Sequence, residues 1–204
     1  KGKNPDYACN AVYAAMIDRM DQGIGQLLEK LDREGLTENT LILFTSDNGP
    51  WLGGYRHDGQ RVELARYNGP FRGMKQDVLE GGIRVPAIVS WPAGVPAGSE
   101  CHEMIHFCDW LPTLAAAART IPDGQPLDGI DALPVLRGEA SANHVKRFWQ
   151  HNRYEPVLHC NMAMRDGDWK LILAPGSGGW TKGSDEHSVQ LYKLADDLGE
   201  QNNL

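Results

Sequence analysis

Residues 40–49 read Thr40-Leu41-Ile42-Leu43-Phe44-Thr45-Ser46-Asp47-Asn48-Gly49. The run from Thr40 to Ser46 is rich in apolar and β-branched side chains without alternation, which is typical of a central parallel strand covered on both faces. Polar residues follow directly at Asp47 and Asn48. Because ligands of open parallel sheets gather beyond the carboxyl ends of the strands, this stretch predicts both a buried strand and a candidate site at its end.

The residues before this strand predict a long helix with one buried face, from about Ala11 to Glu34. Apolar side chains recur there at helical spacing, namely Tyr13, Met16, Ile17, Met20, Ile24, Leu27, Leu28 and Leu31. Gly35 is suited to end the helix, because glycine readily adopts the left-handed conformation after a last turn. A helix followed by a buried strand indicates α/β architecture.

The residues after the site predict first a loop and then a second strand. Residues 49–82 show no strong periodicity and carry many Gly, Arg, His and Asp side chains, so we expect a long surface loop with a functional role. Val85 to Trp91 is predicted as a second buried strand. Residues 108–119 predict a short helix with Asp109 as its N-cap, and we expect its inward face to consist of Leu111, Leu114 and Ala115.

The last third of the chain predicts an antiparallel sheet. Asp166-Gly167 favours a two-residue hairpin turn between strands at residues 161–165 and 168–173, and residues 190–194 would add a third strand. A short helical piece is expected near residues 132–137. We expect residues 1–143 to form part of an α/β domain and residues 144–204 to form a small C-terminal antiparallel α+β subdomain.

Composition excludes several classes of protein. The 204 residues carry 20 basic and 27 acidic side chains, a net charge of −7, which argues against nucleic acid and anionic membranes as partners. No apolar stretch approaches the roughly 20 residues of a bilayer span, so we expect no membrane span. The cysteines, at positions 9, 101, 108 and 160, lack the spacing of a zinc site and are interpreted as buried thiols.

Two spots carry chemistry. Asp47 and Asn48 offer one charged and one neutral oxygen, a pair suited to Ca²⁺ or Mg²⁺, although Asp-Asn-Gly also favours a plain turn. Lys75 lies between Gly73 and Gly81-Gly82, where it can meet a tetrahedral oxyanion, although a solvated loop lysine is the alternative. His57 is a weaker candidate for reaching a substrate, because a solvated loop histidine explains it equally well.

Other residues are interpreted structurally. His102 and His106 are four apart, but no third metal ligand lies near them in the sequence, so we assign them surface or packing roles. Trp149, Trp169 and Trp180 are expected to anchor a core or an interface of the C-terminal layer.

Taken together, these pieces resemble the sulfatase family of the alkaline-phosphatase-like superfamily over nearly the whole chain. The motifs in the family's order are Met20-Asp21-Gln22-Gly23, Thr45-Ser46-Asp47-Asn48-Gly49, Asn68-Gly69-Pro70, Gly73-Met74-Lys75, Glu80-Gly81-Gly82-Ile83-Arg84-Val85-Pro86, Trp91-Pro92, Asp109-Trp110-Leu111-Pro112-Thr113-Leu114, Leu127-Asp128-Gly129, Arg165-Asp166-Gly167-Asp168-Trp169-Lys170-Leu171 and Leu191-Tyr192 with Gly199-Glu200-Gln201-Asn202-Asn203-Leu204.

The resemblance implies an alkaline-phosphatase-like doubly wound sheet and a metal-dependent sulfuric ester hydrolase, acting on a sulfated small molecule or glycan. It implies a formylglycine nucleophile, made from Cys or Ser, and a divalent cation, Ca²⁺ in most members with Mg²⁺ as the alternative. Asp47 and Asn48 match half of the family's metal site, and Lys75 matches the lysine that contacts the sulfate. A periplasmic or secreted location is also implied.

The match covers the C-terminal half of the family's pattern. None of the cysteines is followed by the Pro/Ala and Arg of the formylglycine motif, so we expect the nucleophile and the other metal ligands upstream of Lys1. We therefore expect this chain to be inactive alone, and to pair with the missing N-terminal half or with a second copy. The alternatives are a phosphodiesterase or phosphonate hydrolase of the same superfamily, and a non-catalytic binding module that retention on a heparin column would reveal.

Overall fold

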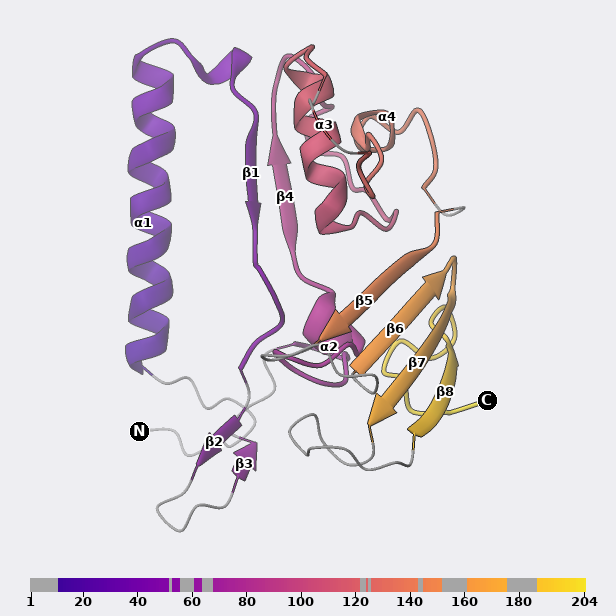
Figure 1. Ribbon diagram of the computed structural model, residues 1–204. Helices are drawn as coiled ribbons and strands as arrows, with labels where there is room; N and C mark the ends of the chain where they lie inside the picture. Colours follow the sequence, from indigo (N-terminus) through magenta and orange to yellow (C-terminus); the bar gives the residue numbers. More distant parts are fainter. Residues whose placement is uncertain are drawn as a thin grey trace.

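The computed structural model describes residues 11–51, 53–55, 61–63, 68–121, 124, 126–142, 145–151, 161–175 and 187–204. Figure 1 shows an N-terminal helix beside a two-stranded sheet, with short helices next to that sheet and a separate four-stranded sheet at the C-terminal end. The elements are α1 (Ala11–Arg33), η2 (Thr37–Asn39), β1 (Ile42–Thr45), β2 (Gly53–Tyr55), β3 (Arg61–Glu63), α2 (Glu80–Ile83), β4 (Ala87–Ser90), η3 (Phe107–Asp109), α3 (Trp110–Ala117), α4 (Leu133–Leu136), β5 (Arg147–His151), β6 (Asn161–Asp166), β7 (Trp169–Pro175) and β8 (His187–Lys193).

Helix α1 follows the predicted bounds, but its apolar face is not covered. The helix runs from Ala11 to Arg33, and Gly35 ends it with a φ of 67°. Met16 is 64% exposed and Leu27 is 58% exposed. Among the described elements, α1 packs only against the short turn η2. The amphipathic pattern therefore predicted the helix correctly, and its apolar face is exposed in this chain.

Strands β1 and β4 are the two predicted apolar strands, and they pair with each other in an antiparallel manner. Ile42 is opposite Ser90 and Thr45 is opposite Ala87. The parallel direction predicted for the first strand is therefore wrong for this pair. Phe44 is 37% exposed and Ile88 is 61% exposed, so the two strands are not covered on both faces in this chain. An apolar run signals the burial of both faces but carries no information about strand direction.

The region predicted as a long surface loop contains regular structure and buried residues. Strands β2 and β3 form an antiparallel pair, with Gly53 opposite Glu63. Helix α2 then buries Glu80, Gly81 and Gly82. These elements are short and have no apolar periodicity, so a pattern search overlooks them.

Helix α3 begins at the predicted place, but its inward face differs from the prediction. Leu111 and Leu114 are 56% and 39% exposed. Ala115 is buried as predicted, and Thr113 is buried although it was not predicted to face inward. The Thr113 hydroxyl is satisfied because it donates to the Asp109 carbonyl at 2.6 Å and accepts from the backbone N–H of Ala132 at 2.8 Å. The predicted short helix near residues 132–137 is confirmed as α4.

The C-terminal sheet has the order β5-β6-β7-β8, and all its neighbours are antiparallel. The predicted hairpin is confirmed. Because Asp166 pairs with Trp169, the two turn residues are Gly167, at a φ of 57°, and Asp168. Strand β8 is longer than the predicted third strand. Strand β5 was not predicted, since Arg147 is buried where an apolar residue is normally expected.

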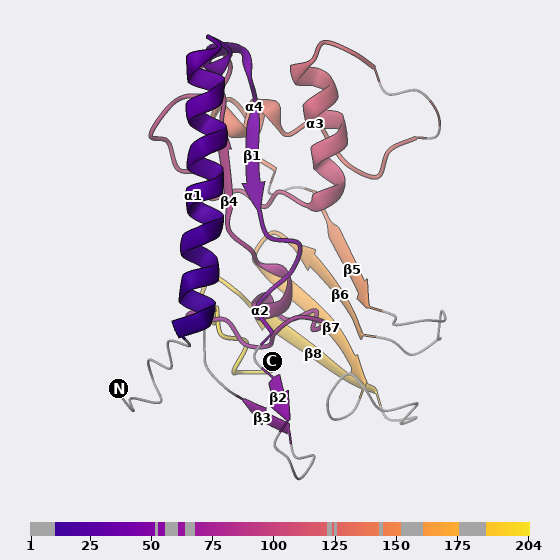
Figure 2. The same cartoon turned by 90° about the vertical axis from the view of Figure 1, so that its left-hand side faces the viewer.

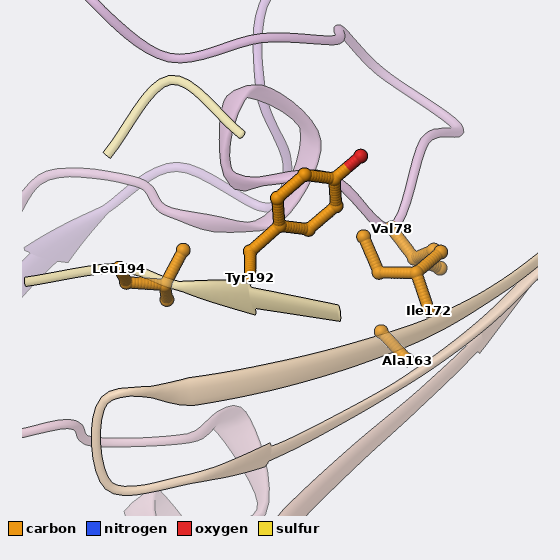
Figure 3. Packing of buried hydrophobic residues seen from close by; sticks show 5 residues of the cluster. All are labelled: Val78, Ala163, Ile172, Tyr192 and Leu194. Carbon is orange, nitrogen blue, oxygen red and sulfur yellow. The ribbon is translucent and has the colours of Figure 1, made fainter. Parts of the chain in front are cut away.

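The main hydrophobic core joins the C-terminal sheet to the segment before α2. Figure 3 shows Val78 beside Ile172 and Ala163, with Tyr192 and Leu194 contributed by β8 and its continuation. A smaller cluster of Ala132, Val135 and Ala142 lies near α4. The division of the chain at residue 143 stays a prediction. In the described part of the chain, no helix has both the length and the apolar character that a bilayer crossing requires.

Candidate active site at the end of β1

The backbone beyond β1 is held by its own side chains. The Thr45 hydroxyl donates to the Pro86 carbonyl at 3.0 Å, which anchors the strand end to the neighbouring segment. The Ser46 hydroxyl donates to the Asn48 carbonyl at 2.8 Å. The Asn48 amide donates to the Gly49 carbonyl at 2.9 Å, so Oδ1 is the amide atom that a cation can take. Asp47 is exposed and Asn48 is partly buried.

Gly49 fixes this segment against α2. Its N–H donates to the Gly82 carbonyl at 2.8 Å. A Cβ atom built on Gly49 would lie 1.8 Å from the Gly81 carbonyl oxygen, far inside van der Waals contact. The close backbone approach therefore requires glycine at position 49, and the location of α2 determines where Asp47 and Asn48 can lie.

Lys75 is joined to the same segment through its backbone. Its N–H donates to the Pro50 carbonyl at 2.9 Å, and its side chain is exposed. The turn that carries Lys75 is closed by Asp77, whose carboxylate accepts from the Met74 N–H at 2.9 Å. The backbone of Gly49 and Pro50, which follows Asp47 and Asn48, is thus hydrogen-bonded both to Gly82 and to Lys75.

The segments around Lys75 pack so closely that only glycines fit between them. The Gly81 N–H donates to the Arg72 carbonyl at 2.7 Å, and a Cβ atom on Gly82 would lie 2.1 Å from the Asp77 carbonyl oxygen. The Asn68 amide donates to the Gly73 carbonyl at 2.6 Å. These glycines therefore allow two backbone segments of the same chain to approach each other closely.

The chemistry of the donor set fits part of a divalent-cation site. Asp47 and Asn48 supply a carboxylate and an amide oxygen, which hard cations prefer. Within the part of the chain that the structure describes, no three or more His, Cys, Asp and Glu side chains gather where they could hold a metal ion. The assignment of Asp47 and Asn48 as metal ligands stays a prediction.

The predicted histidines separate into different surroundings. His57 lies outside the described residues. His102 is exposed, with Nε2 3.6 Å from Glu100 Oε2. His106 Nδ1 lies 3.0 Å from Cys108 Sγ, and its ring is tilted against that of Trp149 at 5.1 Å. Burial lowers the pKa of His106 and raises the pKa of the Cys108 thiol, so this pair is neutral near pH 7 and has a packing role.

Several structural assignments are corrected. Cys101 is exposed rather than buried, and Cys108 is partly buried. Trp169 is 45% exposed, which leaves the interface as the predicted alternative to a core position. Cys9, Cys160 and Trp180 lie outside the described residues.

Sequence reasoning missed the buried ionic groups behind the site. Glu80, Lys170 and Glu200 are among the largest fully buried side chains, and Asp109 and Arg147 form a second buried pair at 2.6 Å. Charged residues are rarely fully buried, so a single sequence gives no local signal for them. Four of them, Glu80, Asp109, Lys170 and Glu200, stand within the quoted motifs, which was the available sign, whereas Arg147 does not.

Comparison with known proteins identifies the family to which this chain is similar. The family model described as Sulfatase matches residues 8–121, and the model described as N-sulphoglucosamine sulphohydrolase, C-terminal, matches residues 74–204. Steryl-sulfatase of Rattus norvegicus is 36% identical over 177 residues, covering 82% of this chain and 28% of that protein. Arylsulfatase G of Canis lupus familiaris is 32% identical over 204 residues, covering 92% of this chain and 37% of that protein.

Solved structures lead to the same family. The crystal structure of Ps i-CgsB in complex with k-i-k-neocarrahexaose aligns with a TM-score of 0.75 at 29% identity, over 94% of this chain and 38% of that one. The chain thus spans less than two fifths of the length of each of these proteins. Since the Sulfatase model matches more than half of its residues, and since its mixed α/β fold follows the C-terminal part of known sulfatases, this chain belongs to the sulfatase family.

Proposed function

We propose that this chain supplies part of the active site of a metal-dependent sulfatase, an enzyme that hydrolyses a sulfate ester to an alcohol and sulfate. Asp47 and Asn48 would be metal ligands and Lys75 would contact the sulfate. The observation that carries the proposal is the backbone network in which Gly49 N–H donates to Gly82 and Lys75 N–H donates to Pro50. These bonds support the proposal, because they connect the segment that follows Asp47 and Asn48 to the segment that carries Lys75.

Each residue has a physical role in this proposal. The Lys75 ammonium would attract the sulfate oxygens and stabilise the negative charge that develops on the leaving oxygen. The oxygens of Asp47 and Asn48 would hold a divalent cation, which screens the charge of the sulfate. We propose Ca²⁺, with Mg²⁺ as the alternative, because Ca²⁺ accepts mixed carboxylate and amide oxygens in flexible geometry. His57 is proposed as a further substrate contact.

The nucleophile is proposed to be a formylglycine that lies outside this chain. It would supply the oxygen that attacks sulfur, while the residues of this chain bind and orient the sulfate. The chain by itself is therefore proposed to be inactive. Its missing N-terminal half would be its partner in the complete enzyme, for which we propose a periplasmic or secreted location.

The substrate class is proposed to be a sulfated small molecule or a sulfated glycan. The relatives support both, since one is named a steryl-sulfatase and one structure contains k-i-k-neocarrahexaose. The phosphodiesterase and phosphonate hydrolase alternative is not favoured, because the matching family models are those of sulfate hydrolases.

The test compares the hydrolysis of an aryl sulfate with that of an aryl phosphodiester that releases the same alcohol. The complete enzyme that carries this chain is incubated with 4-nitrophenyl sulfate, and separately with bis(4-nitrophenyl) phosphate, with and without millimolar Ca²⁺. We expect metal-dependent release of 4-nitrophenol from the sulfate in clear preference to the phosphodiester. Preference for the phosphodiester would reject the proposal.

A further inference from the structure

A buried ionic cluster links the C-terminal residues of the chain to the helix behind the site. Lys170 Nζ, from β7, lies 2.9 Å from Glu80 Oε1 of α2 and 2.9 Å from Glu200 Oε1. The three side chains are at most 1% exposed. We call Glu80, Lys170 and Glu200 the buried triad.

The triad holds together only as a set. Two carboxylates share one ammonium, and Arg84 and Arg165 approach Glu80 Oε2 at 3.6 and 3.8 Å. Removing one partner from a buried ion pair leaves an uncompensated charge away from water, which is strongly unfavourable. The position of each member is therefore coupled to that of the others.

Glu200 contacts α2 from a turn at residues 197–202, which is stabilised by hydrogen bonds of its own. The Asp197 carboxylate accepts from the N–H groups of Gln201 and Asn202 at 2.9 and 2.8 Å. Glu200 has a φ of 51°, a left-handed conformation that is unfavourable for a non-glycine residue. Its Oε2 accepts from the Glu80 N–H at 2.8 Å. The side-chain contacts of Glu200 therefore offset the strain of its left-handed backbone conformation.

The triad contacts helix α2, and the same helix contacts the segment that carries the candidate site. Glu80 begins α2, and two residues later the Gly82 carbonyl accepts the Gly49 N–H at 2.8 Å. The Gly81 carbonyl leaves no space for a side chain on Gly49. A shift of α2 would therefore shift Gly49 and the adjoining Asn48 and Asp47. In both Figure 1 and Figure 2, α2 lies between the end of β1 and the C-terminal sheet.

We propose that Lys170 and Glu200 are positioning residues for the Asp47–Asn48 pair, acting through Glu80 and the Gly49–Gly82 contact. The C-terminal sheet and the last residues of the chain thereby set the geometry of the metal site from behind. The part of this inference that concerns metal rests on the proposed function, whereas the mechanical link does not.

The mechanical link is tested on this chain by amide hydrogen exchange. Glu200→Gly removes the carboxylate and also relieves the backbone strain at residue 200. If the carboxylate matters only within its own turn, the Gly49–Gly82 contact should stay as well protected as in the unmodified chain. The triad account predicts that exchange at Gly49 and Gly82 becomes about tenfold faster or more, as local opening becomes easier. Glu200→Gln keeps an acceptor for the Glu80 N–H and should retain most of the protection. Unchanged exchange in Glu200→Gly would overturn the proposal.

The metal role is tested in the complete enzyme by calorimetric titration with Ca²⁺. We expect Lys170→Met and Glu200→Gly to weaken Ca²⁺ binding about 10- to 100-fold, as lost outer partners of metal ligands do, and added Ca²⁺ to restore part of the rate. Arg147→Met is the matched control, because it breaks the other buried ion pair, with Asp109. The control should lower thermal stability with little change in Ca²⁺ affinity.

The outcomes separate this inference from the proposed function. Equal loss of affinity in the control, or none in the triad variants, would overturn the positioning role. Failure of the unmodified enzyme to bind Ca²⁺ or to hydrolyse the sulfate would instead reject the proposed function. In that case the exchange experiment still decides whether the triad holds the Gly49–Gly82 contact.

Discussion

At the residue scale, Gly49 is the position where a single methyl group has the largest expected effect on the site. A Cβ atom there would meet the Gly81 carbonyl oxygen at 1.8 Å, so two backbone segments would have to separate. We expect Gly49→Ala to lower the free energy of unfolding by about 2 kcal/mol or more, as in other overpacked sites. Chemical denaturation followed by circular dichroism measures it.

Gly25→Ala is the matched control for this substitution. Gly25 lies within α1, and no atom lies within 4 Å of the position of its Cβ. Because alanine favours a helix by about 1 kcal/mol over glycine, the control should be neutral or stabilising. Equal changes in the free energy of unfolding of the two variants would show that the close approach at Gly49 does not require glycine.

Lys75 is expected to act on charge in the reaction rather than on folding. Its side chain is exposed, and its N–H donates to the Pro50 carbonyl. In the complete enzyme we expect Lys75→Ala to reduce kcat/KM for 4-nitrophenyl sulfate by about 3 kcal/mol or more, a loss typical of one preorganised donor. Unchanged kinetics would mean that the lysine is only solvated. The thermal unfolding midpoint is the control measurement and should stay near that of the unmodified protein.

At the scale of elements, pattern reasoning succeeded where periodicity or a turn carried the information. The apolar spacing of α1 and the Gly at position 35 predicted the helix and its end, and Asp166-Gly167 predicted the hairpin of β6 and β7. Strand direction was wrong, because apolar runs do not encode it. The short helix α2 has no periodicity to detect.

The same reasoning explains what could be predicted about the site. Asp47, Asn48 and Lys75 were selected by residue type, by neighbouring glycines and by the family's order of motifs. The structure adds the contact between Gly49 and Gly82 and the triad that supports it. Lys170 and Glu200 are far from Glu80 in the sequence, and their pairing depends on the tertiary fold, which no local pattern reveals.

The buried ion pair between α2 and β7 leads to a prediction about the stability of the fold. Lys170 is fully buried between Glu80 and Glu200. We expect Lys170→Met to lower the free energy of unfolding by about 3 kcal/mol or more, because two carboxylates lose their shared cation in the interior. Pairing this change with Glu80→Gln should recover part of the loss. Additive losses in the double variant, measured by urea denaturation, would contradict the coupling.

The C-terminal turn predicts a pH dependence. Burial raises the pKa of Glu200 above its ordinary value of 4.5, and the nearby Lys170 only partly opposes it. The folded chain therefore binds the proton more tightly than the unfolded chain, and this contribution to stability is present at low pH and is lost as pH rises through the folded pKa.

This pH dependence is measured by comparison with Glu200→Gln, which cannot titrate. The stability of the unmodified chain should fall relative to that of the variant as pH increases from below 4.5 to neutrality. Urea denaturation at each pH gives the difference between the two proteins. A difference that grows in favour of the unmodified chain with rising pH would show that Glu200 is stabilised as a carboxylate instead.

At the scale of the whole molecule, the uncovered apolar surface predicts association. At least 43% of the surface is exposed for each of the apolar side chains Met16, Ile17, Leu27 and Ile88. Exposed apolar surface of this kind favours association with another protein surface. We expect this chain by itself to self-associate when it is folded, as judged by light scattering coupled to size-exclusion chromatography. Replacing Met16 and Leu27 with Lys should reduce the apparent mass. A monomer at micromolar concentration would contradict the expectation.

The central claim, that Asp47 belongs to the metal site of a sulfatase, is tested most directly by one activity measurement. The complete enzyme and its Asp47→Ala variant are compared in the hydrolysis of 4-nitrophenyl sulfate over a range of Ca²⁺ concentrations. The account predicts that the unmodified enzyme shows metal-dependent turnover and that the variant has lost it. Near-normal, metal-dependent turnover in Asp47→Ala would contradict the account.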